Sequence, residues 1–264
     1  MRLRRSLETA GVSATALALI LAVWETTARI SGLNPSIFPP PSSIVRTVLR
    51  LVEPSGGQSI LGLDIVSSLS RLSLGLAIGA PMGLACGLAA GINRYAYSVL
   101  HPLVNVLIPV PPYAWVPLLL VWLGPGDLTI ITATALSSAL PLAYATMAGV
   151  RGVDRLHVWV MQSLGGSRGD VIRRVVVPGA LASILAGLRL SLGQSWRTLI
   201  GAEFLAAHGS GLGFLIYNAQ QFLAVNTMFA GLLTLGVLGF LLIYWLVTLL
   251  EDHTVVRWGI MTRR

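Results

Sequence analysis

The feature that most constrains this chain is a set of uncharged apolar stretches, each as long as a membrane-crossing helix. Residues 72–93, 128–150 and 228–250 contain no charged side chain. A helix that crosses the hydrocarbon core of a bilayer needs about 20 mostly apolar residues. Only 11% of all residues are charged, whereas soluble domains carry about 25%, so an ordinary soluble fold is excluded.

Six stretches are predicted to span the membrane: 11–32, 72–93, 95–126, 128–150, 180–203 and 228–250. The first could also be a cleaved signal peptide, because Arg2, Arg4 and Arg5 precede its short apolar region. A span is favoured, since no small-x-small cleavage site follows the apolar run. Within it, Glu25 and Arg29 are spaced i,i+4 and are expected to pair on one helix face.

The arginines predict how the spans are oriented. Six spans place both termini on one side, which then carries twelve arginines, whereas the opposite side carries only Arg46 and Arg50. Cytoplasmic segments of membrane proteins are enriched in Lys and Arg. We therefore expect an all-α integral membrane protein with six transmembrane helices and both termini cytoplasmic. Its predicted parts are residues 1–60 (first helix and outer amphipathic segment), 61–250 (main transmembrane domain, with a cytoplasmic loop at 151–178) and 251–264 (cytoplasmic tail).

Several chemistries are excluded by the residue types present. All 18 basic residues are Arg and lie mostly in short segments between apolar stretches, so the net charge of +8 does not indicate nucleic-acid binding. A phosphate-binding P-loop needs a lysine, which the chain lacks. Gly165–Gly169 fits a G-x-S-x-G nucleophile motif, but no strand pattern precedes it. With a lone Cys86 and four widely separated histidines, neither a metal site nor a cofactor is predicted.

A short segment after the first span is expected to lie on the outer membrane surface. Three prolines at 39–41 favour an extended backbone. Ser42 and Ser43 are predicted to cap a helix over residues 44–51, which combines apolar residues with two arginines. This pattern is typical of an interfacial helix.

Glycine recurs at every fourth position of the second predicted span and forms a groove along one helix face. The bare backbone of such a groove lets a second helix approach closely. The contact is either a seam against a helix that moves or static packing within the bundle. The helix-packing glycines are Gly75, Gly79, Gly83, Gly87 and Gly91.

The third predicted span contains four prolines, and each removes a backbone donor and clashes with the preceding turn. One regular helix cannot accommodate them all. Broken backbone at membrane depth is tolerated only where protein or a water-filled cavity satisfies it. The segment is therefore predicted to border a pathway through the membrane, with simple kinking as the alternative. The prolines are Pro109, Pro111, Pro112 and Pro117.

Charged residues also occur within the predicted spans. Arg189, Arg197 and Glu203 lie in or at the end of the fifth span, and Arg71 borders the second. Such charges are costly in a membrane and face the bundle interior or water. Arg197 is the deepest, and Gln194 lies about one turn before it. The two are expected to line a polar path suited to an anion, with structural pairing as the alternative.

The loop at 151–178 is far longer than two antiparallel helices need. Apolar residues from Leu156 to Leu164 recur at helical spacing, and Gly165–Gly166 ends that helix. A second short helix is predicted from Ile172 to Pro178. Apolar faces on short helices outside the membrane indicate a docking partner. The candidate docking residues are Leu156, Trp159, Val160, Leu164, Gly165, Val175 and Pro178.

This loop resembles the coupling motif of type I ABC importer permeases, which reads Glu-Ala-Ala, three residues, Gly, nine residues, Ile-x-Leu-Pro. Gly165 and then Val175–Pro178 reproduce the spacing from Gly to Pro. Trp159–Met161 stand where the motif has Glu-Ala-Ala, so a polar contact usual at the ATPase interface is missing. Apolar docking remains available to this segment.

Further short matches, spread over nearly the whole chain, resemble the nitrate, sulfonate and taurine branch of these permeases. Each match is weak alone, and their common order and spacing carry the resemblance. They are Gly187–Arg189, Trp196–Arg197, Ala202–Glu203, Gly211–Gly213 with Ile216, Met228–Gly231, and the prolines at 39, 41 and 109–117.

The resemblance implies the permease subunit of an ATP-driven importer in a bacterial plasma membrane, with no catalysis of its own. The implied partners are a pair of ABC ATPase subunits that grip the loop at 151–178, an external substrate-binding protein, the lipid bilayer, and a second permease copy in a homodimer. The implied substrate is a small anion such as a sulfonate, taurine or nitrate. A gradient-driven secondary transporter is the alternative, although such proteins often show two similar inverted halves, which this sequence lacks.

Overall fold

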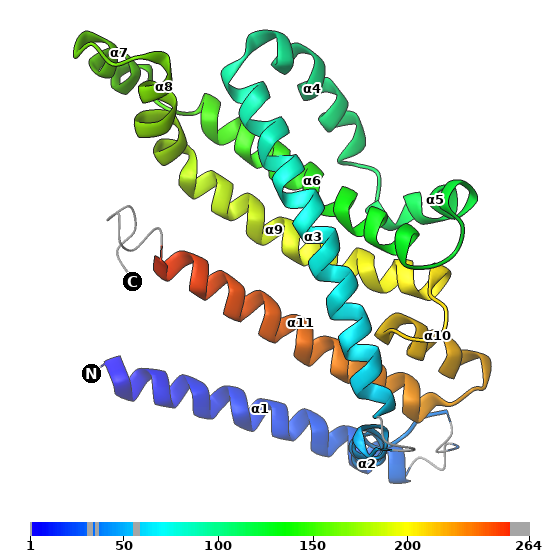
Figure 1. Ribbon diagram of the computed structural model, residues 1–264. Coiled ribbons are helices and arrows are strands. Elements are labelled where there is room, and N and C mark those ends of the chain that lie inside the picture. Colours follow the sequence, from blue (N-terminus) through cyan, green and yellow to red (C-terminus); the bar gives the residue numbers. More distant parts are fainter. Residues whose placement is uncertain (1, 31–33, 35–36, 55–58, 254–264) are drawn as a thin grey trace.

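The computed structural model describes residues 2–30, 34, 37–54 and 59–253, with side chains described from residue 15 to residue 244. Within these residues the regular secondary structure is helical throughout, without strands (Figure 1), which confirms the predicted all-α class. The elements are α1 (Arg2–Ile30), α2 (Pro41–Val52), α3 (Ile60–Ile92), α4 (Arg94–Leu107), a 3-10 turn η1 (Pro112–Trp115), α5 (Val116–Leu123), α6 (Asp127–Arg151), α7 (Arg155–Ser163), α8 (Arg168–Val171), a π turn η2 (Ile172–Val176), α9 (Val177–Ala206), α10 (Leu212–Gln221) and α11 (Val225–His253).

Three long helices, α3, α6 and α9, form the core of the bundle, with α6 packed along both of the others. Buried hydroxyl groups are common on α6, and several of them donate to carbonyl oxygens of the helix backbone. Thr134 Oγ1 donates to the Ile130 carbonyl oxygen at 2.7 Å. Across the α6–α9 contact, Ser191 Oγ donates to the Ser138 carbonyl oxygen at 2.8 Å. Small polar residues thus allow close helix packing, and several of their hydroxyl groups are paired with backbone carbonyl oxygens.

The five recurring glycines, here called the glycine face of α3, lie directly against α6. A β-carbon added to Gly83 would come within 2.5 Å of the Ala139 carbonyl oxygen, a backbone atom that cannot rotate aside. The other four glycines are equally close to α6. From Gly75 to Gly91 in chain order, their nearest α6 side chains are Thr134, Ser138, Thr146 and Val150.

We expect Gly83→Ala to destabilise the protein, because overpacking a tight contact costs about 1–3 kcal/mol. The measurement is the midpoint temperature at which the detergent-solubilised protein loses its monodisperse elution peak. Gly236→Ala in α11 is the matched control, since nothing lies within 4 Å of its added β-carbon. A midpoint for Gly83→Ala equal to that of the control would contradict the close packing of α3 on α6.

The second predicted span begins too late. α3 starts at Ile60 rather than at residue 72, after Ser59, whose hydroxyl accepts from the Gly62 N–H at 3.0 Å. Arg71 therefore lies inside the helix and is buried, instead of bordering a span. The prediction was wrong because it ended the span at a charge, whereas the structure supplies partners for that charge.

The third predicted span, 95–126, is not one helix. α4 and the η1–α5 segment are bent by 92° at the break between Leu107 and Pro112. Pro109 and Pro111 lie in this break, where no helical hydrogen bond needs their missing N–H groups.

The sequence predicted that the short helix ending at Pro178 is separate from the fifth span. This prediction was wrong, because α8, η2 and α9 form one continuous stretch from Arg168 to Ala206. The Val177 N–H donates to the Ile172 carbonyl oxygen, five residues back. This wider turn directly precedes Pro178, which occupies the first turn of α9. A proline is tolerated in a first turn, where its N–H is not required, so the helix continues through it.

The predicted count of six spans is not reached within the described residues. Four helices are long and apolar enough to cross a membrane, and the bent α4–α5 pair would be a fifth. α1 overlaps the first predicted span, but it is not among the four, and its side chains are described only from residue 15. The four are Ile60–Ile92, Asp127–Arg151, Arg168–Ala206 and Val225–Tyr244.

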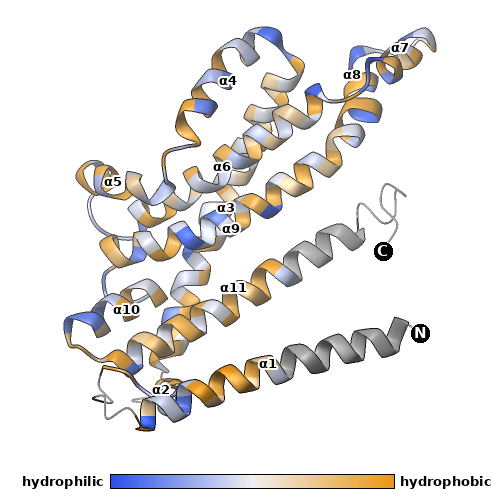
Figure 2. Ribbon diagram, turned by 180° about the vertical axis from the view of Figure 1, so that it is seen from behind, coloured by the Kyte–Doolittle hydropathy of each residue, from blue (hydrophilic) through white to orange (hydrophobic). Residues whose placement is uncertain are grey.

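The two ends of the bundle carry different elements. α7 and α8 project at one end, and α2, α5 and α10 lie at the other (Figure 1). α11 and the described part of α1 are mostly apolar, and hydrophilic residues gather near α7 and α8 and near α10 (Figure 2). The predicted tail, 251–264, lies outside the described residues except for the last turn of α11.

The predicted serine cap of α2 is wrong. The helix begins at Pro41, after Pro40, and its N-cap makes no side-chain hydrogen bond. Ser42 instead joins α2 to α1, because its N–H donates to Glu25 Oε2 at 3.0 Å. The predicted i,i+4 pair is confirmed, with Arg29 Nη2 2.6 Å from Glu25 Oε1. The second serine, Ser43, donates to Pro40 and contacts α11.

Candidate functional site

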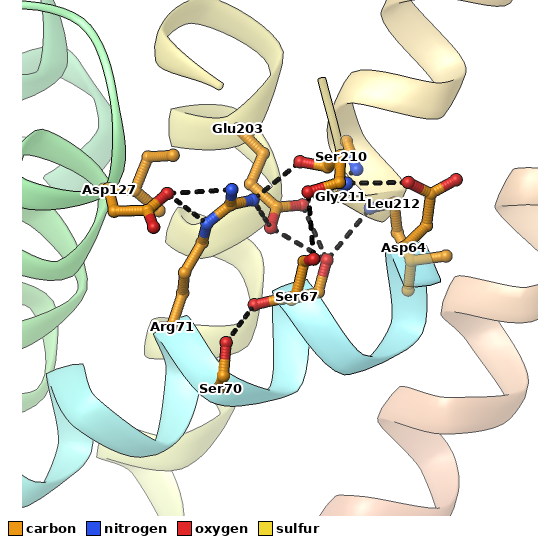
Figure 3. Close-up of polar contacts among 12 residues, drawn as sticks. Asp64, Ser67, Ser70, Arg71, Asp127, Glu203, Ser210, Gly211 and Leu212 are labelled. Carbon is orange, nitrogen blue, oxygen red and sulfur yellow. Dashed lines mark hydrogen bonds and ion pairs between the residues drawn. The ribbon is translucent and has the colours of Figure 1, made fainter. Parts of the chain in front are cut away.

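A buried arginine joins three helices near the α10 end of the bundle (Figure 3). The Arg71 side chain extends from α3, and its Nη1 lies 2.9 Å from Oε1 of Glu203 in α9. Its Nη2 lies 2.8 Å from Oδ1 of Asp127 in α6. Nη1 also donates to the Ser210 carbonyl oxygen at 2.8 Å. We call Asp64, Ser68, Arg71, Asp127, Glu203 and Ser210 the charge junction.

The two carboxylates that pair with Arg71 differ sharply in their environment. The Glu203 side chain is 0% exposed, whereas that of Asp127 is 66% exposed. Glu203 also accepts from Ser68 Oγ, 2.8 Å from Oε1. Removing one partner of a buried ion pair leaves an unpaired buried charge, which is strongly destabilising. Solvent screens an exposed pair, so its loss costs little. The Arg71–Glu203 half of the junction is therefore the structurally critical half.

The charge junction also caps the N-terminus of α10. The N-cap position is held by Gly211, which has φ 129° and no side chain that could accept a hydrogen bond. The first N–H groups of a helix lack partners within the helix and carry partial positive charge. Here they find partners on distant helices. The N–H groups of residues 211, 212 and 213 donate to Asp64 Oδ1, Ser68 Oγ and Glu203 Oε2 at 2.8, 2.9 and 2.9 Å.

Sequence reasoning identified Arg71 and Glu203 as charges but did not bring them together. The missed signal was available, because Asp64, Ser68 and Arg71 are spaced i, i+4 and i+7 and share one face of α3. Three polar residues on one face of an otherwise apolar helix indicate a polar partner. That partner, at the end of α9, could be found only in the folded chain.

We expect Glu203→Ala to be far more destabilising than Asp127→Ala. Removing one partner of a buried pair costs about 3–5 kcal/mol, whereas an exposed pair contributes no more than about 1 kcal/mol. Both variants remove a carboxylate from the same guanidinium, so each controls for the other. The measurement is the survival of monodisperse protein in detergent on heating. Equal losses of monodisperse protein in the two variants would contradict the conclusion that the Arg71–Glu203 pair is the structurally critical half.

A cavity of about 400 Å³ lies between the α4–α5 break, α6 and α9. Its lining combines apolar residues with neutral polar ones. Of the six residues predicted for a pathway or gate, the structure brings Pro112 and Gln194 together here. Polar lining residues include Asn105, Ser137, Tyr144 and Gln194.

The other predicted pathway residues do not line this cavity. Pro109 and Pro111 lie in the exposed break beside it, and Pro117 is exposed in the first turn of α5. Arg197 is also exposed, and its Nε donates to the Gly193 carbonyl oxygen of its own helix at 3.1 Å. On a helical wheel it lies within 60° of Gln194, so the two share a face of α9.

The segment from Arg155 to Pro178, here called the coupling segment, begins with an ordered helix. The Asp154 carboxylate caps α7 by accepting from the Leu156 N–H at 2.9 Å. The helix ends at Ser163, and Gly165, two residues later, has a φ of +78°, in the left-handed region that favours glycine. Ser167 of the G-x-S-x-G motif forms a capping box with Asp170, so it acts as a helix cap.

The apolar residues of α7 point in different directions. Val158 and Met161 pack inward against a small core that includes Val171 and Val176. Leu156, Val160 and Leu164 line a groove of about 650 Å³, together with Val175. Trp159 is exposed and does not line that groove, and Pro178 lines a second hollow. The predicted docking residues are thus distributed over the groove, the exposed Trp159 and the hollow at Pro178.

Comparison with known proteins shows the family of the chain. The family model described as "Binding-protein-dependent transport system inner membrane component" matches residues 79–256. This chain belongs to that family. The match covers α6, the coupling segment, α9 and α10. The resemblance to ABC importer permeases that the sequence predicted is therefore confirmed.

Named relatives carry the comparison further. The chain is 36% identical over 227 residues to the taurine transport system permease protein TauC of Escherichia coli (strain K12), covering 86% of this chain and 82% of TauC. A permease named for aliphatic sulfonates in Bacillus subtilis (strain 168) is 34% identical, covering 84% of this chain and 79% of that protein. The nitrate import permease protein NrtB of Synechocystis is 29% identical, with coverage of 87% and 84%.

A solved structure shares the fold. The MetNI methionine ABC transporter, in inward-facing conformations, matches with a TM-score of 0.52 at 17% sequence identity. The alignment covers 77% of this chain and 94% of that one. At this identity the likeness concerns the fold alone, and it agrees with the all-helical architecture described above.

Proposed function

We propose that this chain is the membrane-spanning subunit of an ATP-driven importer in a bacterial plasma membrane. It catalyses no reaction itself and is moved by separate ABC ATPase subunits that bind the coupling segment. The observation that carries the proposal is the geometry of α7–α9. Exposed apolar residues of α7 project from the bundle, and the buried side of α7 packs through Val158 and Met161 on the start of an unbroken helical stretch that runs from Arg168 to Ala206 in the core. Family membership supports the same function.

The proposed membrane arrangement keeps six spans and cytoplasmic termini. α1 and the α4–α5 pair supply the two spans beyond the four long apolar helices. In Figure 1 the coupling segment lies at the end of the bundle where α1 begins and α11 ends. The arginines concentrate in segments at that end, which supports a cytoplasmic location for it. An external binding protein would then deliver substrate at the α10 end.

Two copies of the chain would enclose the pathway. Arg197 is exposed on a candidate span, and a charge facing lipid there would be costly. A second copy of the chain packed against the face of α9 that carries Gln194 and Arg197 would exclude lipid from this face. The two copies would then enclose a polar path between them. Closure of the ATPases on ATP would shift the pair between two packings, with α3 and α6 held together by the glycine face.

The first test is co-purification of the tagged chain in mild detergent. A stoichiometric ABC ATPase, lost when α7 is deleted or replaced by a Gly/Ser linker, is the expected result. A stable, folded complex that carries no ATPase would overturn the proposal and favour a gradient-driven transporter. Uptake into liposomes that depends on internal ATP, and not on an ion gradient, distinguishes the same alternatives.

We expect Gly165→Val to uncouple ATP hydrolysis from uptake while leaving membrane insertion intact. No atom lies within 4 Å of a β-carbon at this position, so the effect is on the backbone. A left-handed conformation costs a non-glycine residue about 1–2 kcal/mol and is worst for β-branched ones. Reconstituted transporter should keep its ATPase activity but lose most uptake. Gly169→Val, in the same segment without positive φ, is the control. Unchanged uptake in Gly165→Val would count against the docking role.

The proposed substrate is a small anion such as taurine, an alkanesulfonate or nitrate, following the names of the relatives. We expect Arg197→Ala to reduce uptake of the transported anion by at least about tenfold, the effect of losing a charge-assisted hydrogen bond of 1.5–3 kcal/mol. Arg197→Lys should retain much of the uptake because it keeps the charge. Radiolabelled taurine, an alkanesulfonate and nitrate are tested in parallel. If Arg197→Ala transports as well as wild type, the residue has no role in the pathway.

A further inference from the structure

The exposed side of α7 is unusually apolar for a helix that projects away from the bundle. Trp159 is 60% exposed and Leu164 is 78% exposed. Leu156 and Val160 are also exposed, next to the groove described above. An indole and three aliphatic side chains are thus exposed on fewer than three helical turns, which water does not favour. Aromatic residues of this kind are typical central anchors of protein interfaces.

The charges around these apolar residues are unbalanced. Both acidic residues of the coupling segment and its cap are already engaged: Asp154 caps α7, and Asp170 accepts from Ser167 and pairs with Arg174 at 3.4 Å. Within the coupling segment, all of which the structure describes, the side chains of three exposed arginines make neither a hydrogen bond nor an ion pair with the chain. They are Arg155, Arg168 and Arg173. The coupling segment therefore combines exposed apolar residues on α7 with three unpaired arginines, here called the basic rim.

The groove indicates a protein partner rather than a lipid surface. It is concave, about 650 Å³ in volume, and enclosed between α7 and the start of α9, with Val175 and Gly179 on the second wall. A protruding side chain of a partner fits such a hollow, whereas a flat bilayer surface does not enter it. Trp159 lies outside this groove, so the partner must contact α7 from two sides.

We infer that the surface receiving α7 is an apolar cleft with an acidic rim, in which the Trp159 indole is the central anchor. The inference rests on the proposed function, because the partner is the ABC ATPase subunit. It specifies the chemistry of that subunit's docking face: an apolar pocket for Trp159, an apolar projection into the α7–α9 groove, and Asp or Glu side chains opposite Arg155, Arg168 and Arg173. Charge complementarity of this kind governs association and partner choice.

The test uses the purified full-length permease in lipid nanodiscs and the ATPase subunit that co-purifies with it, separately purified. Binding of the ATPase is measured for wild type, Trp159→Phe, Trp159→Ala and Trp159→Glu. Loss of a central aromatic anchor should weaken binding about 30-fold in Trp159→Ala. Trp159→Phe should stay within a few-fold of wild type, and Trp159→Glu should bind no better than Trp159→Ala. The exposed side chain can be replaced without disturbing a packed core, which thermal stability verifies.

The basic rim is tested by the salt dependence of ATPase binding. Wild-type binding should weaken as NaCl rises from low to high concentration, and Arg168→Glu should weaken it further while flattening that salt dependence. A charge-reversed acidic residue on the ATPase should restore the binding of Arg168→Glu. Binding that is independent of both salt and Arg168→Glu would overturn the acidic rim.

The outcomes separate this inference from the proposed function. If no ABC ATPase binds the wild-type chain, the proposed function fails. If the ATPase binds wild type but binds Trp159→Ala equally well, or Trp159→Glu more tightly, the apolar cleft is overturned. The fluorescence of Trp159 is obtained by subtracting the emission of Trp159→Phe from that of wild type, with ATPase bound. If brominated lipid quenches this fluorescence, the indole lies in lipid and the inference is also overturned.

Discussion

The guanidinium of Arg71 is the group on which the α10 end of the bundle depends, because a buried charge must be paired. Glu203 provides the buried partner, and the same carboxylate, with Asp64 and Ser68, satisfies the first N–H groups of α10. Without this arrangement α10 would begin at a glycine that offers no cap. Since α10 leads directly into α11, the position of the last long helix follows from the same contact.

The opposite end of the bundle is linked to this junction by rigid elements. One helical stretch runs from Arg168 in the coupling segment to Ala206, just beyond Glu203. Its contacts with α6, and those of α6 with the glycine face of α3, leave little room for sliding, since even a β-carbon would clash at Gly83. A displacement imposed at the coupling segment would therefore reach the α10 end through packed helices. Family membership gives such a displacement its proposed source, the closure of an ATPase.

The sequence predicted some of these features from residue type and spacing. Uncharged runs located three of the long helices, and a mostly apolar run with two arginines located a fourth. The prolines at 109–117 predicted a broken helix, and Glu25 with Arg29 predicted an ion pair. Other expectations were wrong where a charge or a proline was treated as an end. Arg71 lies inside α3 because distant carboxylates pair with it, and Pro178 lies inside a continuous stretch because a π turn precedes it.

The sequence by itself determined the helical class, the apolar character of the long helices and the family, because these depend on composition and on short-range spacing. Only the tertiary structure decided which helices meet and which charges pair. Asp64, Arg71, Asp127 and Glu203 are up to 139 positions apart, and their attraction acts only once α3, α6 and α9 are packed together. The direction of each apolar side chain on α7 was likewise decided by the core beneath it, which takes Val158 and Met161 and leaves Trp159 exposed.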